Sequence, residues 1–133
     1  MISKQQAEGR LRRLFQGGVI ERIPRNSEDA RLFLALAASS FDPRNVYSES
    51  GVNEQLKEWM DGFTCPDEMD HVSVRRHLVD SHFLLRDTSG ATYRVNQAVI
   101  NQVIEPAARS IQPRYVLEDV QREKKERKHS NAT

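Results

Sequence analysis

Within residues 27–95 the apolar residues follow a helical spacing in some segments and a strand spacing in others, and the order of these segments limits the folds that the chain can adopt. Two helical patterns with a short extended piece between them are followed by a loop, a third helical pattern and two β-type segments. Ser27, Ser48 and Asp70 stand where the helices should begin, since their side chains accept hydrogen bonds from a first helical turn. Residues 83–95 hold a Gly-containing turn and predict a hairpin. This order is typical of a winged helix-turn-helix and predicts an α+β fold.

Further helices flank this core on both sides. A capping box at Ser3 and Gln6 predicts a helix over residues 4–16, and an extended arm leads from it to the core. Two helices are expected after the hairpin, and the second becomes the charged sequence QREKKERKHSNAT, which has no apolar face and is expected to fray. The sequence therefore divides into an N-terminal helix and arm (1–26), a winged-helix domain (27–95) and a C-terminal helical extension with a charged tail (96–133).

The length and composition of the chain exclude several classes of protein. The chain has 133 residues, of which 38% are hydrophobic, and a domain of this size buries about two thirds of its unfolded surface. Its single cysteine, Cys65, excludes an internal disulfide and a CxxC motif, which favours a reducing compartment. No apolar run approaches the ~20 residues of a membrane span, and charges occupy the place of a signal peptide's apolar region. We therefore expect a cytoplasmic protein with no membrane contact.

The net charge of +1 hides an uneven distribution along the chain. Residues 1–26 carry six basic and two acidic side chains (+4), and residues 106–133 carry seven and four (+3). Between them, residues 27–105 have seven basic and thirteen acidic side chains (−6). Basic ends suit contact with an anionic partner, but runs of charge also occur on faces that contact water alone. Both interpretations stay open.

Four stretches of the core read, in order, IERIPR, VYSESGVNEQLKEW, DHVSVRRHLVDSHFLLRD and SGATYRV. In these stretches the chain resembles a bacterial family known as domain of unknown function 2087, over about residues 19–95. The positions that fall on the family's pattern are Ile23, Pro24, Tyr47, Ser48, Glu49, Val52, Asn53, Leu56, Asp70, Arg75, Arg76, Leu78, Val79, Asp80, Leu84, Arg86, Gly90 and Tyr93. The resemblance implies a winged-helix-like fold and a suspected role in transcription, with no established activity.

The helix expected over residues 70–81 is the candidate for reading DNA. A helix-turn-helix protein places such a helix in the major groove, while other contacts to phosphates fix its position. At about 100° per residue, Val72, Val74 and Leu78 fall in one apolar arc and the polar residues lie opposite. Arginine forms paired hydrogen bonds with guanine, and serine and histidine meet base edges or phosphates. The DNA-binding candidates are therefore Ser73, Arg76 and His77 on the helix and Arg86 and Arg94 on the hairpin.

Arg75 lies inside the apolar arc of the same helix. Its simpler role is structural, with the stem packed on the core and the guanidinium paired with Glu49 or Glu54 of the preceding helix. The alternative is a contact with DNA phosphate. Asp80 stands one turn after Arg76 and could pair with it, which leaves this face nearly neutral and weakens a DNA-binding interpretation. A basic footprint would form if the N-terminal segment folded next to the hairpin.

Metal and catalytic sites are not indicated. Cys65, Asp67 and His71 are close in sequence, but the histidines of this region lack the i, i+4 spacing of a helical ligand pair. The sequence contains no phosphate-binding glycine loop and no nucleophile motif. We therefore expect no catalytic residue, no metal and no cofactor.

Two functions follow from these observations, and both are non-enzymatic. The first is a DNA-binding, transcription-regulatory module that contacts double-stranded DNA. The second is a protein-interaction module that uses the acidic surface of the helix after Ser48, with Glu54 and Glu58, and the apolar outer helices. The outer helices, one with Leu11 and one with Ile100, are also candidate surfaces for a homodimer.

Overall fold

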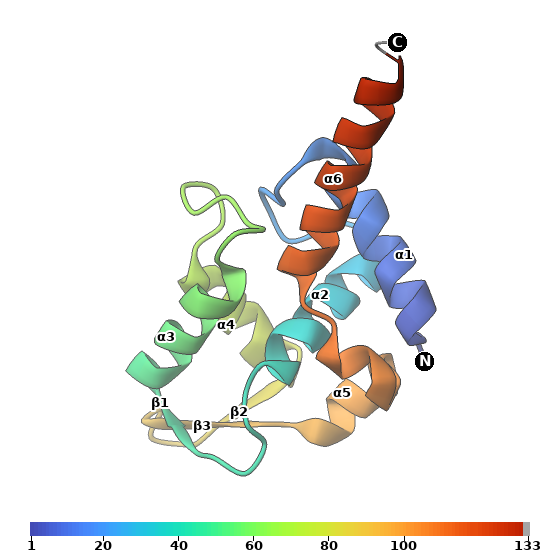
Figure 1. Cartoon of the computed structure of the whole chain (residues 1–133). Coiled ribbons are helices and arrows are strands. Elements are labelled where there is room, and N and C mark those ends of the chain that lie inside the picture. Colours follow the sequence, from blue (N-terminus) through green and yellow to red (C-terminus); the bar gives the residue numbers. More distant parts are fainter. Residues whose placement is uncertain (132–133) are drawn as a thin grey trace.

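The computed structural model describes the backbone of residues 1–131 and the side chains of residues 1–128. This part of the chain forms an α+β fold with a three-stranded antiparallel sheet (Figure 1). The α-helices are α1 (Lys4–Leu14), α2 (Ser27–Ser39), α3 (Glu49–Met60), α4 (His71–Asp80), α5 (Gln97–Val103) and α6 (Pro113–Asn131). The strands are β1 (Tyr47–Ser48), β2 (Leu84–Arg86) and β3 (Thr92–Val95), and the 3-10 helices are η1 (Phe15–Gly17) and η2 (Pro106–Ser110). The predicted order of elements from residue 27 to residue 95 is present.

Local hydrogen bonds start the helices. Ser3 and Gln6 form the predicted capping box at α1, in which each side chain accepts a hydrogen bond from the backbone N–H of the other. Ser48 and Asp70 cap α3 and α4, as predicted. The predicted cap at Ser27 is wrong, because the amide oxygen of the preceding residue, Asn26, accepts from two N–H groups of the first turn of α2 at 3.0 and 3.1 Å.

The sheet lies at one end of the molecule and has the strand order β1-β3-β2 (Figure 1). β2 and β3 form the predicted hairpin, with Leu84 paired to Val95 and Arg86 paired to Tyr93. β1 adds to the free edge of β3, with Tyr47 opposite Tyr93. Because side chains alternate between the faces of a strand, the buried Leu84, Tyr93 and Val95 all point to the core face.

α2 is the central helix of the core. Every side chain from Leu32 to Ala38 is buried, as expected for a helix that other elements surround. Four aromatic rings form edge-to-face contacts beside it, namely Phe15, Phe33, Trp59 and Phe63. These rings come from η1, α2, α3 and the loop after α3, so one apolar cluster joins the N-terminal segment to the rest of the fold.

α1 and α6 lie side by side (Figure 1), and the start of α6 also contacts α3, where Arg114 donates a hydrogen bond to the backbone oxygen of Glu58. Leu11 of α1 and Leu117 and Val120 of α6 are buried in the same core as α2. α5 likewise buries Ile100 and Val103. The apolar faces of the outer helices are therefore covered within one chain.

The C-terminal helix continues beyond its packing contacts. α6 is helical through Asn131, whereas the last buried side chain among those described is Val120. The tail predicted to fray is therefore helical over most of its length, and its residues 132–133 lie outside the described residues. This helix is strongly charged, and among residues 1–131 no helix is long and apolar enough to cross a membrane.

Candidate nucleic-acid interface

α4 presents the polar face that the sequence predicts. Val74 and Leu78 are fully buried and fix the helix against the core. Ser73, Arg76 and His77 on the opposite side are exposed. The fold therefore holds three chemically different polar side chains toward solvent on a firmly packed helix, which is the arrangement that directional recognition needs.

Asp70 holds the first turn of α4. Its carboxylate accepts a hydrogen bond from the N–H of Ser73 at 2.6 Å, and the hydroxyl of Ser73 donates to the same carboxylate at 3.3 Å. These bonds, the backbone bond first, lower the pKa of Asp70 below its usual value of 3.8. The hydroxyl of Ser73 is therefore partly used within the protein.

The apolar side of α4 is narrower than predicted. Val72, which its helical position puts in the apolar arc, is 38% exposed. It stands one turn before Arg76, at the border of the polar face, where the core does not cover it. A DNA-facing surface on α4 would therefore contain an apolar contact as well as polar ones.

Arg75 connects α4 to the start of α3. Its guanidinium forms an ion pair with Glu49 at 3.0 Å and donates a hydrogen bond to the amide oxygen of Asn53. The side chain of Arg75 is 16% exposed, so it is mostly covered by protein. Of the two partners predicted, Glu49 and Glu54, Arg75 pairs with Glu49. The contact with Asn53 was missed, although its position one turn after Glu49 puts both side chains on the same face of α3.

A hollow of about 200 Å³ lies between α4 and the hairpin. The charged and aromatic residues that line it are Glu49 of α3, Arg75, Arg76 and Asp80 of α4, and Arg86 and Tyr93 of the hairpin. Three guanidinium groups and two carboxylates thus meet there, with one net positive charge. The hollow is smaller than usual sites for organic ligands, and its size and charge suit a phosphate group.

Arg86 is placed in this hollow by its neighbours on the hairpin. It pairs in register with Tyr93, which is buried, and its guanidinium carbon lies 5.9 Å from the centre of the Tyr93 ring. Gly90, with a φ of +76°, brings the backbone of the turn against the same guanidinium. The sequence predicted Arg86 as a site residue and Gly90 as a turn residue, but not that the turn at Gly90 lies against the guanidinium of Arg86.

Asp87 fixes the turn of the hairpin. Its carboxylate accepts hydrogen bonds from the N–H groups of Thr92 and Ala91 at 3.3 and 2.9 Å and from the hydroxyl of Ser89 at 3.0 Å. The bonds from Thr92 and then Ser89 and Ala91 lower the pKa of Asp87 below its usual value of 3.8. The turn is therefore ordered by its own side chains.

Arg94 does not line the hollow with Arg75, Arg76 and Arg86. It pairs in register with Leu85, and both side chains are exposed. Since Arg94 follows the inward-facing Tyr93 directly, it points to the opposite face of the sheet from Arg86. The two hairpin arginines predicted from the sequence therefore lie on different faces.

The basic footprint that the N-terminal segment could have formed next to the hairpin is absent from the described structure. The N-terminal basic segment does not lie next to the hairpin, since α1 packs against α6 and η2 instead (Figure 1). Among the described side chains, Arg76 and Asp80 form no ion pair, so Arg76 is not held by its neighbour. The face of α4 keeps a free guanidinium but gains no charge from the N-terminus.

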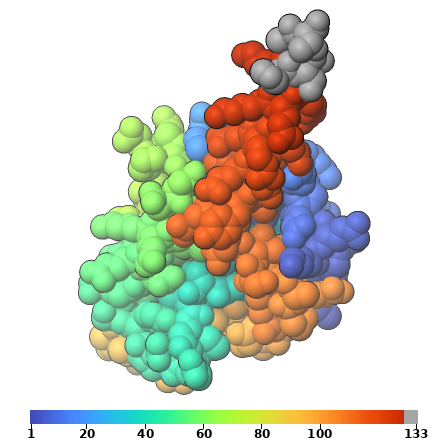
Figure 2. Space-filling model, viewed as in Figure 1, coloured from blue at the N-terminus to red at the C-terminus, as the bar shows by residue number. Residues whose placement is uncertain are grey.

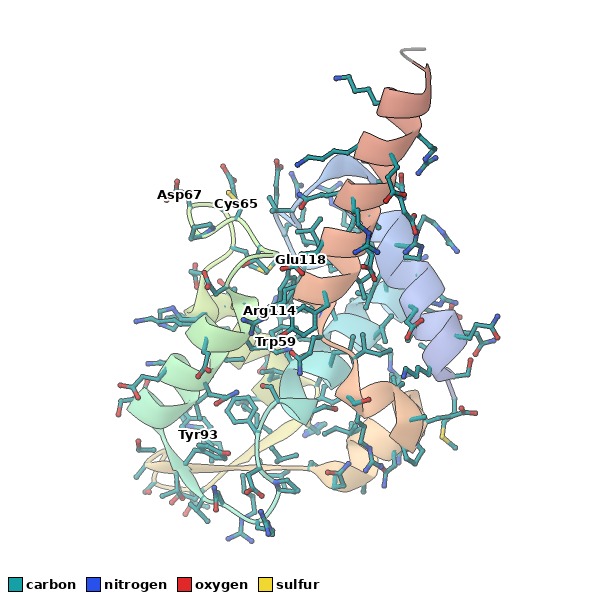
Figure 3. The ribbon with its side chains drawn as sticks, in the orientation of Figure 1. Trp59, Cys65, Asp67, Tyr93, Arg114 and Glu118 are labelled. Atoms are coloured by element: carbon teal, nitrogen blue, oxygen red, sulfur yellow. The ribbon has the colours of Figure 1, made fainter. Side chains whose placement is uncertain are left out.

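The loop between α3 and α4 contains the residues weighed as metal ligands. Figure 3 shows Cys65 and Asp67 in this loop, and Cys65 is a half-buried free thiol. His71 follows at the start of α4, where burial and then the nearby Lys57 lower its pKa. Within the part of the chain that the structure describes, no three His, Cys, Asp or Glu side chains are grouped closely enough to hold a metal ion.

A family of bacterial proteins matches the chain over residues 19–95, which is more than half of its length. Its description is "Uncharacterized protein conserved in bacteria (DUF2087)". The chain belongs to this family. The part that is common to DUF2087 proteins begins after α1 and ends with β3, so it contains α4, the hairpin and the hollow between them. No curated protein and no solved structure shows significant similarity to the chain.

Proposed function

We propose that this DUF2087 protein is a non-enzymatic, DNA-binding module of transcription regulation with a winged-helix fold. The element order α2-β1-α3-α4-β2-β3 and the strand order β1-β3-β2 support this fold, because they put a pair of helices and a hairpin around one small core. In such a fold α4 enters the major groove and the hairpin lies along the DNA backbone.

The observation that carries the proposal is the exposed polar face of α4 beside the arginine-lined hollow. Arg76 forms two hydrogen bonds with guanine, and Ser73 and His77 contact neighbouring base edges or phosphates. A backbone phosphate occupies the hollow and pairs with Arg86. Arg94 contacts the backbone from the other face of the hairpin.

Arg75 has a positioning role in this proposal. Its guanidinium is already bonded to Glu49 and Asn53, so it orients α4 relative to α3 and adds positive potential to the hollow. Direct contact with phosphate would require it to leave these partners. R75A should therefore lower stability, whereas R86A should lower affinity for DNA with little effect on folding.

The test is in vitro selection of random and genomic duplexes on the full chain at about 150 mM salt, where weak non-specific binding is partly suppressed. We expect enrichment of one sequence motif. R76A should lose this enrichment. R44A should keep it, because Arg44 is exposed, pairs with Asp42 and does not line the hollow. No enrichment with the wild type, or equal enrichment with R76A, contradicts the proposal.

One observation favours a second function, that of a protein-interaction module without DNA binding. α3 exposes Glu49, Glu54 and Glu58, and residues 27–105 have a net charge of −6. Such a surface repels phosphate and suits a basic protein partner. If selection yields no motif, crosslinking in bacterial cells tests this function, and a partner that is lost with E54Q/E58Q supports it.

A homodimer through the outer helices stays a prediction, as does a cytoplasmic location. Leu11 of α1 and Ile100 of α5 are buried in the core of their own chain. A dimer built on these helices would therefore use their exposed sides. Sedimentation velocity of the full chain measures whether such a dimer forms.

A further inference from the structure

α1 and α6 end at the same end of the molecule. They run side by side in the same direction, so residues far apart in the sequence meet there (Figure 1). Arg12 forms an ion pair with Glu123, and the ammonium of Lys124 donates a hydrogen bond to the backbone oxygen of Gln16. These contacts hold α6 against α1 as far as Lys124.

The two helix ends together form a strongly basic surface, which we call the basic end. It consists of Arg12 and Arg13 of α1 and the five basic residues of positions 121–128 of α6, namely Arg122, Lys124, Lys125, Arg127 and Lys128. The same two segments contain two acidic residues, Glu123 and Glu126, so their net charge is +5 and that of the remaining chain is −4. The fold thus gathers charge that the sequence distributes to both termini.

The charges of positions 121–128 are sorted around α6 rather than mixed. At about 100° per residue, with Val120 at 0°, the two acidic residues lie between about 240° and 300°. The five basic residues occupy the arc from about 340° through 0° to about 200°. From Lys125 to Lys128 every side chain is exposed. One continuous basic face therefore extends past the end of α1.

Contacts within the chain account for only part of this face. Arg12 pairs with Glu123, Arg122 pairs with Asp119 and Lys124 donates to the backbone of Gln16, whereas Lys125, Arg127 and Lys128 have no partner among the described side chains. Positions 121–128 bury no side chain, and like charges one turn apart, such as Lys124 and Lys128, weaken a helix. Basic residues do stabilise a helix C-terminus, but that effect is confined to the last turn. Lys124 and Lys125 stand well before that turn, since α6 ends at Asn131.

We propose that the basic end binds the phosphate backbone of duplex DNA without reading its sequence. Eight helical residues span about 12 Å, and duplex DNA carries one negative charge per about 1.7 Å of its axis, so several phosphates lie within reach. Figure 2 shows α6 protruding from the body of the molecule, and every side chain from Lys124 to Lys128 is exposed, so a large partner can reach them.

This inference rests on the proposed function for the identity of its ligand, but it assigns a different surface. The hairpin and the basic end lie at opposite ends of the molecule (Figure 1). Both α1 and α6 lie outside residues 19–95, the part common to the family. The basic end supplies the electrostatic affinity that the nearly neutral face of α4 lacks.

The test measures binding of the full chain to a duplex of about 30 base pairs of random sequence by fluorescence anisotropy, at about 50 to 200 mM salt. The tail variant is K124Q/K125Q/R127Q/K128Q. We expect it to bind at least about tenfold more weakly at about 100 mM salt. The slope of log affinity against log salt should become shallower by up to about 3.6, since each of the four lost phosphate contacts removes about 0.9.

Two further variants separate the position of the charges from their number. The control K4Q/R31Q/R44Q/K57Q removes four exposed charges elsewhere, and its salt slope should change by less than about 1. The exchange K125E/E126K keeps the composition but puts an acid in the basic arc, and it should weaken binding by about threefold. Circular dichroism of each variant verifies that the helical content is unchanged.

The outcomes decide the inference separately from the proposed function. Weaker binding by the tail variant alone supports the basic end, even if R76A shows that α4 selects no motif. Equal binding by the tail variant and wild type, or equal weakening in the control, overturns the inference, even if R76A abolishes motif selection. Tighter binding to polyglutamate than to duplex DNA also overturns it.

Discussion

The face of α4 and the basic end differ in how they are held and in what they can recognise. The face of α4 stands over two fully buried residues, Val74 and Leu78, and presents donors and acceptors of different kinds. The basic end presents one kind of group, cations gathered on one arc of α6, along positions 121–128 that bury no side chain. Base discrimination needs directional hydrogen bonds from a fixed element, whereas attachment to a phosphate backbone needs positive charge within reach. The two surfaces therefore suit different parts of one task.

The residues that match the family contain one of these two surfaces and not the other. Residues 19–95 contain α4 and the hairpin, whereas α1 and α6 lie outside them. In the functions proposed above, the common part discriminates sequences and the flanking helices hold the protein on DNA. Variants that affect one surface and spare the other test this distinction.

The largest effect is expected from L78A, which removes the anchor of α4. Leu78 is completely buried, so the lost contacts and the remaining cavity should lower the free energy of unfolding by about 2–5 kcal/mol. Urea denaturation measures this loss. The control V72A changes a 38% exposed residue of the same helix and should stay within about 0.5 kcal/mol of wild type. Similar losses in both variants would show that α4 is not fixed by its buried side alone.

A smaller effect is expected from G90A in the turn of the hairpin. Gly90 has a φ of +76°, and a β-carbon there would lie 2.5 Å from the guanidinium of Arg86. The flexible guanidinium can move aside, but the backbone strain remains and should cost about 1–2 kcal/mol of unfolding free energy. Affinity for DNA should fall to that of R86A, because the guanidinium leaves its place beside Tyr93.

The control for this variant is G17A. Gly17 has open space where its β-carbon would lie and no left-handed φ, so alanine should be neutral or slightly stabilising there. If G17A and G90A lower stability equally, the strain at Gly90 is not the cause. If G90A lowers stability and leaves affinity unchanged, Arg86 does not act from the hollow.

The features that the sequence predicted well depend on hydrogen bonds between close neighbours. The capping box of Ser3 and Gln6 and the caps at Ser48 and Asp70 are each formed within three residues. The ion pair of Arg75 with Glu49 follows from helix periodicity and the packing of adjacent helices. The cap of α2 was placed one residue late because Asn26 and Ser27 are both good capping residues, and local preference does not choose between them.

The features that were missed depend on contacts between distant segments. The basic N-terminal segment packs on α6 through a core that includes Leu11 and Leu117, and neither residue's local pattern names its partner. The separation of Arg86 and Arg94 depends on the alternation of strands whose register the sequence left open. The surface of α4 was thus predictable, whereas the position of the charge around it was not.

A pH dependence tests the first turn of α4. The pKa of Asp70 is lowered below 3.8, so its carboxylate adds stability above about pH 3.8 and that contribution is lost as the pH falls through the lowered pKa. D70N still caps the helix but does not titrate. The unfolding free energy of wild type should therefore exceed that of D70N near neutral pH, and the difference should vanish in acid.

The smallest effect is expected from D80N. Asp80 lines the hollow with Arg76 and Arg86, and its carboxylate opposes a phosphate there. Its removal should raise affinity for the selected motif by about two- to fivefold.

E126Q removes one carboxylate from the basic end and is the matched variant. It should raise affinity for the motif and for random duplex by the same factor, since phosphates are common to both. If α4 enters the groove in a fixed position only on the motif, a phosphate reaches the hollow only there, so D80N favours the motif over random duplex and E126Q does not. Anisotropy with the two duplexes measures this ratio, and equal ratios for both variants would mean that the two surfaces are not specialised.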